Sequence, residues 1–279
     1  MDQPPENDSR NQQLTIPSGS FPNGRLIMAA TTLGDPADIP LRSLAALRDA
    51  DLVIFEDARA GRQFLKAAGV HREFAVWSEH AEPATHDQFT ATLRNRGTVV
   101  YMSDQGSPTL ADPGQALVAM ATQLRASITV IPGPSSIAAA LSACPFPVPR
   151  FVFTGLLHRD PEERRMELAQ FALTRLPLIV IDAPYRLRAL LDDAASCLGD
   201  GHRAFLALDI SGPRESFLSG PLEKLKAAMA AETEKINFVL ITEGDPSPRA
   251  SRDTSGDARG FARGKGQEPR RDRNRARRR

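Results

Sequence analysis

Three short loops rich in glycine, proline and small hydroxyl residues are the places where this chain could bind a ligand. They span residues 31–38, 103–108 and 132–136, and the second continues into Asp112-Pro113-Gly114. Each loop follows a short apolar run that is typical of a buried strand. Glycine lets a backbone approach a ligand closely, and small serines leave room for a flat adenine or a ribose. Because ligands of open parallel sheets bind beyond the carboxyl ends of the strands, the three loops together predict one such site.

Taken singly, each loop also has a purely structural explanation. Asp112 can cap a helix that has Pro113 at its first position, and Pro134-Ser135 can simply begin another helix. The order and spacing of all three loops, rather than any one of them, favour a ligand site.

Several common catalytic motifs are missing from the sequence. It has no G-x-G-x-x-G after the first apolar run, no G-x-x-x-x-G-K-[ST] and no G-x-S-x-G, which argues against a Rossmann dinucleotide site, a P-loop and a hydrolase elbow. The histidines lack metal-ligand spacing, and Cys144 and Cys197 are too few for a zinc knuckle or a disulfide framework. We therefore expect a reaction that uses no metal ion.

The composition predicts a globular, cytoplasmic protein with a basic tail. Of the 279 residues, 41% are hydrophobic and 25% are charged, with no apolar run long enough for a membrane span and no signal peptide at the polar start. Residues 245–279 hold 12 Lys/Arg and 5 Asp/Glu, a balance of +7, whereas residues 1–244 carry −6. Such a tail often contacts nucleic acid through phosphates, although it can also be a solvated extension.

Apolar runs and helical patterns alternate through the middle of the chain and predict an α/β fold with two domains. Residues 24–147 indicate a largely parallel sheet with helices on both faces, whereas strand follows strand near residues 205–219 and indicates a mixed sheet in residues 148–244. Residues 1–23 and 245–279 have few large apolar groups, so we expect disordered N- and C-terminal tails.

Seven segments, taken together, resemble the tetrapyrrole-methylase superfamily of S-adenosylmethionine (SAM) enzymes. The resemblance runs from about residue 24 to residue 244, and within the superfamily it is strongest to enzymes that methylate the 2′-oxygen of a cytidine in small-subunit ribosomal RNA (rRNA). The segments are Leu33-Gly34-Asp35-x-x-Asp38-Ile39, Glu56-Asp57-x-Arg59, Glu79-His80-x-Glu82, Ser103-Asp104-x-Gly106-x-Pro108, Asp112-Pro113-Gly114, Pro132-Gly133-Pro134 and Ala183-Pro184-Tyr185-Arg186.

The resemblance implies two α/β domains of the tetrapyrrole-methylase type that hold SAM between them, commonly in a homodimer. The residues that it implies for SAM binding are Thr31, Leu33, Gly34, Asp35, Ser103, Asp104, Gly106, Pro108, Ser135, Ser136, Asp182 and Ala183. It implies rRNA or the small ribosomal subunit as the substrate, contacted by Arg59, Tyr185 and Arg186. SAM carries its own electrophile, so the protein mainly has to align the methyl group with a nucleophilic oxygen.

The general base stays open at this point. A ribose hydroxyl is a weak nucleophile, so a nearby proton acceptor would help the reaction. The candidates from the matched segments are Asp57, Glu79, His80 and Glu82. Each could equally be a helix cap or a member of a surface ion pair.

Departures from the family pattern keep two other functions open. Where the family has Arg-Glu-Leu-Thr-Lys, this chain has Leu208-Asp209-Ile210-Ser211-Gly212, so both basic side chains are missing. The lysine usually found after Gly-Phe-Leu-Pro has no match at Gly155-Leu156-Leu157-His158. The alternatives are a diverged paralogue that methylates a tetrapyrrole or another small molecule, and a non-catalytic paralogue that binds SAM or RNA.

Overall fold

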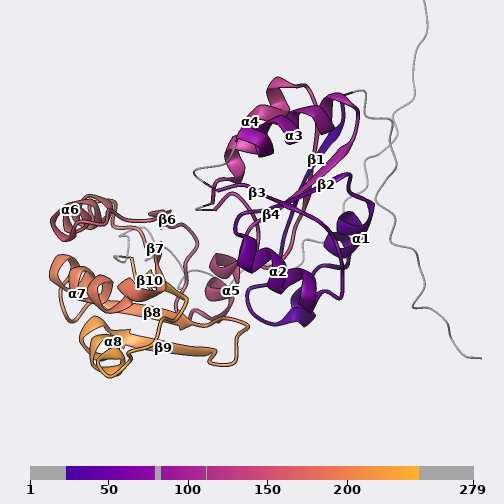
Figure 1. Ribbon diagram of the computed structural model, residues 1–279. Coiled ribbons are helices and arrows are strands. Elements are labelled where there is room, and N and C mark those ends of the chain that lie inside the picture. The colour runs from indigo at the N-terminus through magenta and orange to yellow at the C-terminus, as the bar shows by residue number, and fades with distance from the viewer. Residues whose placement is uncertain (1–22, 79–82, 111, 245–279) are drawn as a thin grey trace, which may run out of the picture. The chain divides into compact units, whose positions relative to one another are not determined.

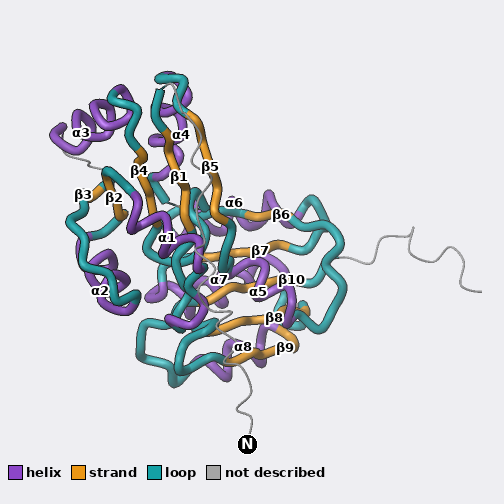
Figure 2. The backbone as a smooth tube through the Cα atoms, turned by 90° about the vertical axis from the view of Figure 1, so that its right-hand side faces the viewer, coloured by secondary structure: helices purple, strands orange, loops and turns teal. Residues whose placement is uncertain are grey.

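The first part of the chain folds around a five-stranded parallel sheet. The computed structural model describes residues 23–78, 83–110 and 112–244. The strands are β1 (Arg25–Ala29), β2 (Leu52–Phe55), β3 (Ala75–Val76), β4 (Thr98–Met102) and β5 (Ser127–Ile131). They pair in the order β3-β2-β4-β1-β5 (Figure 2), and every pair is parallel. The carboxyl ends of β1, β2 and β4 therefore lie at the same edge of the sheet.

Helices cover both faces of this first sheet because its central strands are apolar at almost every position after Arg25 of β1 and Thr98 of β4. Successive side chains of a strand point to opposite faces, so Leu26 and Ile27 of β1 belong to different cores. On one face pack α1 (Leu41–Asp49) and α2 (Ala58–Ala67), and on the other α3 (Pro83–Arg94) and α4 (Gly114–Gln123) (Figure 1). A short 3-10 helix, η1 (Pro36–Asp38), follows β1.

The second part of the chain forms a mixed sheet. Its strands are β6 (Val152–Phe153), β7 (Leu178–Ile181), β8 (Arg203–Leu208), β9 (Ser216–Pro221) and β10 (Phe238–Thr242), in the order β6-β7-β10-β8-β9 (Figure 2). β6 and β7 are parallel, and the remaining pairs are antiparallel. As a result, β7 and β8 end, and β10 begins, at one edge of this sheet.

Helices also cover both faces of the second sheet. On one face lie α6 (Pro161–Ala172), α7 (Leu187–Leu198) and α8 (Leu222–Met229), with a 3-10 helix, η2 (Pro184–Arg186), leading into α7 (Figure 1). The other face packs against α5 (Ser136–Ala143), through Ala140 and its neighbours. The chain thus reaches the second sheet already at α5, which directly follows the third of the three loops.

The α/β fold class expected from the sequence is confirmed: the first sheet is parallel and the second is mixed. The expected disorder of residues 1–23 and 245–279 concerns stretches that, apart from Asn23, lie outside the described residues. None of the described helices is both long and apolar enough to cross a membrane.

Candidate functional site

A pocket of about 660 Å³ opens where strand ends of the two sheets meet. From the first sheet it is lined by the segments that follow β1, β2 and β4, and from the second by the ends of β7 and β8 and the start of β10. The lining residues that carry the argument below are Leu33, Gly34, Glu56, Ser103, Asp104, Gln105, Asp112, Ser136, Asp182, Asp209 and Asn237.

Hydrogen bonds tie the first two loops together behind the pocket. The Thr31 N–H donates to the Gly106 carbonyl over 2.9 Å, and the Gly106 N–H donates to the Thr32 carbonyl over 3.1 Å. The hydroxyls of Thr31 and Ser103, both buried, also donate to the Gly106 carbonyl, over 3.3 and 3.2 Å. Gly106 is therefore the point at which the strand-end loops after β1 and β4 are joined.

The third loop packs onto the same glycine. Gly106 has a φ of +70°, which side-chain-bearing residues rarely adopt, and a Cβ there would lie 2.9 Å from the Pro134 carbonyl oxygen and 3.0 Å from Leu33 Cδ2. The Ser107 hydroxyl donates to the Pro134 carbonyl over 3.0 Å. The three loops singled out from the sequence are thus brought together around one residue that must be small.

A turn of the second sheet contacts the first loop. The Asp35 N–H donates to the Ser211 hydroxyl over 3.1 Å, and that hydroxyl also donates to the Asp38 carboxylate. A Cβ on Gly34 would lie 2.7 Å from the Ser211 carbonyl oxygen, so the close approach depends on glycine. The turn that contains Ser211 thus joins the two sheets at the pocket.

A second bridge across the pocket is formed by side-chain amides. Gln105, from the loop after β4, accepts a hydrogen bond from the Asn237 amide over 3.0 Å and donates to the Leu33 carbonyl over 3.1 Å. Asn237 lies just before β10. Gln105 therefore connects two loops of the first sheet to the start of a strand in the second.

Asp182 lines the pocket from the end of β7 and is held by Arg186. The two side chains form an ion pair in which the Asp182 side chain is fully buried. The Arg186 guanidinium also donates to the carbonyls of Leu157 and His158 over 3.3 and 3.0 Å. One buried Asp182 oxygen, Oδ2, has no hydrogen-bond partner among the described residues.

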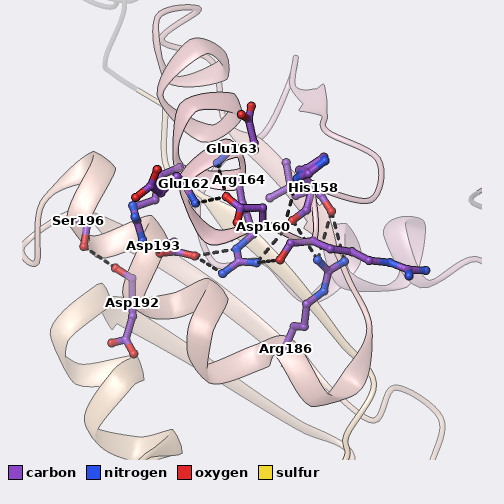
Figure 3. Close-up of polar contacts among 12 residues, drawn as sticks. His158, Asp160, Glu162, Glu163, Arg164, Arg186, Asp192, Asp193 and Ser196 are labelled. Carbon is purple, nitrogen blue, oxygen red and sulfur yellow. Dashed lines mark hydrogen bonds and ion pairs between the residues drawn. The ribbon is translucent and has the colours of Figure 1, made fainter.

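The loop after β6 is fixed from its other side by a buried ion pair. Figure 3 shows Arg164 between His158 and Asp193, with Arg186 on the opposite side of His158. Arg164 Nη2 lies 2.6 Å from Asp193 Oδ2, and Arg164 Nη1 donates to the carbonyl of Arg159 over 3.1 Å. Two arginines thus bind successive carbonyls of this loop and set its position relative to Asp182.

Acidic side chains gather on the first-sheet side of the pocket. The Asp104 N–H donates to Glu56 Oε2 over 3.3 Å, and the Tyr101 hydroxyl donates to Asp112 over 3.1 Å. Partial burial and then the charge of Asp104 raise the pKa of Glu56 to about 7. Partial burial and then the charge of Asp57 also raise the pKa of Asp104. Glu56 is consequently a carboxyl group that changes its protonation state near neutral pH.

Six of the residues expected at the cofactor lie in the pocket wall, namely Leu33, Gly34, Ser103, Asp104, Ser136 and Asp182. The other six lie behind or beside the lining: Thr31, Asp35, Gly106, Pro108, Ser135 and Ala183. Thr31 and Gly106 hold the loops as described, Asp35 caps η1, and Ser135 precedes α5. Pro108 lines a different cavity, of about 460 Å³, next to β5.

Of the residues expected as the general base or as substrate contacts, the described ones are not among the residues that line the pocket. Asp57 caps α2, where its Oδ1 accepts from the Arg59 and Ala60 N–H groups over 2.8 and 3.0 Å. Arg59 and Tyr185 are exposed. Glu79, His80 and Glu82 lie outside the described residues.

Sequence reasoning missed Glu56, Asp209 and Asn237 as parts of the pocket wall, whereas Gln105 belongs to the predicted loop 103–108. Glu56 carried a usable signal, because it directly follows a buried strand whose carboxyl end meets the three loops. Asn237 carried none, because its position depends on how β10 pairs with strands far away in the sequence.

The charge of the pocket limits what it can hold. Among its described lining residues five are acidic, and none is lysine, arginine or histidine. Such a wall attracts a cation and provides acceptors for ligand hydroxyl and amino groups, but it repels phosphates and carboxylates. The pocket therefore suits a positively charged ligand rich in hydrogen-bond donors.

Comparison with known proteins places this fold and pocket in a family. The family model described as Tetrapyrrole (Corrin/Porphyrin) Methylases matches residues 25–226. The chain belongs to this family, as its sequence motifs indicated, and it is a SAM-dependent methyltransferase.

Within this family, the chain is similar to curated proteins that share one name. The chain is 35% identical over 230 residues to the Ribosomal RNA small subunit methyltransferase I of Mycobacterium tuberculosis, which covers 82% of this chain and 80% of the relative. It is 33% identical over 221 residues to the protein of the same name from Neisseria meningitidis, covering 79% of this chain and 76% of the relative.

Solved structures share the fold at lower identity. Diphthine synthase aligns with a TM-score of 0.63 at 16% identity, over 79% of this chain and 90% of that one. The uroporphyrin-III C-methyltransferase of Thermus thermophilus, complexed with S-adenosylhomocysteine, aligns with a TM-score of 0.56 at 19% identity, over 78% of this chain and 97% of that one.

The pocket residues fit SAM on physical grounds. The volume lies within the range of about 300–1,000 Å³ that is usual for small-molecule sites. The acidic wall complements the sulfonium and ammonium groups of SAM, which together outweigh its single carboxylate. When bound, SAM would supply the electrophilic methyl group, and the chain's task is to hold it, exclude water and manage the proton of the acceptor.

Proposed function

We propose that this enzyme methylates the 2′-oxygen of a cytidine ribose in small-subunit rRNA. The observation that carries the proposal is the pocket wall, which has five acidic and no basic side chains among its described residues. Such a pocket can admit the sulfonium and a ribose hydroxyl while the RNA phosphates remain outside it. The proposed rRNA substrate is taken from the names of the relatives, which match this chain along most of its length.

The same wall argues against a tetrapyrrole substrate. Porphyrin and corrin precursors carry several carboxylates, which would face Glu56, Asp104, Asp112 and Asp209 without a counter-charge from the pocket wall. A neutral or cationic acceptor group avoids this repulsion, and a ribose hydroxyl is such a group.

We propose that SAM is bound by the residues expected from the family resemblance that line the pocket, with Thr31 and Gly106 holding the loops. RNA contacts are then left to the exposed rim. Tyr185, 66% exposed, offers an aromatic face for a base, and the exposed Arg59 offers a charge for a phosphate. The Arg186 guanidinium is engaged by Asp182 and by loop carbonyls, which supports a positioning role for it.

We also propose that the enzyme is a homodimer that works in the cytoplasm on ribosomal subunits. β5 is an edge of the first sheet, and its Ile128 and Val130 side chains are 41% and 60% exposed. Apolar side chains on an unpaired edge strand favour association with a second copy. Light scattering should give twice the chain mass and a lower mass for Val130→Lys; a monomeric wild type would contradict the dimer.

The function is tested by offering three acceptors with tritiated SAM. These are small ribosomal subunits from cells lacking the enzyme, the deproteinised rRNA of those subunits, and a carboxylate-bearing tetrapyrrole. Transfer to either RNA form but not to the tetrapyrrole supports the proposal. Transfer to the tetrapyrrole, or calorimetric binding of SAM without transfer to any acceptor, would replace it with one of the alternatives raised by the sequence.

A further inference from the structure

We propose that the Glu56 carboxylate accepts the proton that the ribose hydroxyl loses during methyl transfer. The inference rests on the proposed function, because it assumes a hydroxyl as the acceptor. It assigns the base to a residue that was not among the four sequence candidates.

Glu56 is in the right place for this role. It directly follows β2, at the sheet edge where β1 and β4 also end, and it lines the pocket together with Leu33, Ser103 and Asp104. Its one hydrogen bond among the described residues, from the Asp104 N–H at 3.3 Å, engages Oε2. Oε1 thus has no donor in the described part of the chain and can accept a proton from a bound substrate.

The adjacent carboxylate is in a different situation. Asp57 Oδ1 accepts two N–H groups at the start of α2, and the side chain is exposed. The N–H of Ala60 and, more weakly, that of Arg59 lower the pKa of Asp57. A carboxylate committed to a helix cap and with a lowered pKa is a poor proton acceptor. Two neighbouring acids thus have separate tasks, one in the helix and one in the pocket.

The charges that face Glu56 favour proton uptake near neutral pH. They belong to Asp104 and Asp112 from the segments after β4 and to Asp57 on its own segment, and Tyr101 of β4 lies nearby as a neutral phenol. With partial burial, they bring the pKa of Glu56 to about 7, where a base is both ionised in part and basic enough to act. A cation in the same pocket favours the ionised form and so prepares the base.

The step balances without any further reactant. The ribose oxygen forms a bond to the methyl carbon, the carbon–sulfur bond breaks with its electron pair remaining on sulfur, and the hydroxyl proton passes to Glu56. No oxidation state changes. The protonated Glu56 then returns its proton to solvent after the products leave.

The first test follows the carboxyl group itself. In free protein with 13C-labelled glutamate side chains, one carboxyl resonance should titrate near pH 7, and Glu56→Gln should remove it. Asp104→Asn should move that titration to lower pH, because a negative charge is lost. Asp57→Asn, the matched control, should leave it in place apart from a smaller shift. A Glu56 resonance that titrates near its ordinary pH would overturn the inference.

The second test is single-turnover methyl transfer at saturating SAM and RNA. We expect Glu56→Gln to lose about 10²–10⁴-fold in rate and to lose the rise in rate with pH that the wild type shows. Asp57→Asn should keep that rise. A Glu56→Gln rate within threefold of wild type, with an unchanged pH profile, would refute the role of Glu56 while leaving the proposed function intact. A wild type that transfers nothing to RNA would instead refute the proposed function.

Discussion

Replacing Gly106 with alanine tests two requirements at this position: a positive φ, and the absence of a Cβ that would contact the third loop. Gly69 provides the control, because it has a similar φ of +63° but no atom within 4 Å of an added Cβ. At Gly106 the added Cβ would lie 2.9 Å from the Pro134 carbonyl oxygen, which belongs to the backbone and has to move. In both variants an alanine has to adopt a left-handed backbone conformation, which lowers the stability of the fold. Only in Gly106→Ala does the added Cβ also push the loops apart.

The expected magnitudes differ accordingly. A left-handed alanine costs about 1–2 kcal/mol, which is the whole expected effect of Gly69→Ala on the free energy of unfolding. Overpacking against the Pro134 carbonyl adds about 1–3 kcal/mol, so Gly106→Ala should lose about 2–5 kcal/mol. Urea denaturation measures both values, and calorimetry measures SAM affinity. SAM binding should weaken at least tenfold in Gly106→Ala, a loss of about 1.4 kcal/mol, and stay unchanged in Gly69→Ala. Equal SAM affinity in the two variants would refute the conclusion that Gly106 joins the three loops at the ligand site.

Four further outcomes are expected. Arg164→Leu should lower the free energy of unfolding by about 3 kcal/mol, the lower end of the effect of an unpaired buried charge, because the buried Asp193 keeps only the more exposed Arg165, 3.2 Å away, as its partner; Arg164→Leu/Asp193→Leu should recover most of that loss in urea denaturation. Glu56→Gln should stabilise the fold at pH 8 but not at pH 4: the pKa of Glu56 is raised on folding, so stability falls as pH rises between the unfolded value and about 7. Truncation after Gly244 should weaken RNA binding and flatten its salt dependence, which changes by about 0.7–0.9 in log–log slope per phosphate contact, while SAM affinity stays constant in calorimetry. Chelators should leave the methyl-transfer rate unchanged; loss of activity with EDTA and its return with a divalent cation would contradict the metal-free reaction.

Local sequence was sufficient for much of the fold because the buried strands carry their own signal. β1, β2 and β4 are buried on both faces, so each is recognisable in the sequence as an almost continuous apolar run. Helical patterns lie between these runs, and this alternation is typical of an α/β protein. The sequence did not show in the same way which sheet α5 packs against. Its apolar side chains show that it is buried but not which sheet covers it, and it packs on the second sheet.

For a related reason, only some residues of the candidate site could be predicted from the sequence. The loops after β1 and β4 could be found because each follows its strand directly, and both reach the pocket. Asn237 lies just before β10 and Asp209 just after β8, and the antiparallel pairing of these two strands joins segments far apart in the sequence, so no local pattern shows that both residues reach the pocket. Glu56 and Asp57 are adjacent and chemically alike, and only the course of the backbone into α2 decides which one caps the helix.

The central claim is tested most directly by locating the transferred methyl group. Small ribosomal subunits from cells lacking the enzyme are incubated with the protein and with SAM whose methyl group carries three deuterium atoms, and the RNA is then digested to nucleosides for mass spectrometry. The account predicts a deuterated cytidine whose label fragments with the ribose. A label on the base, on another nucleoside or on no nucleoside at all would contradict it.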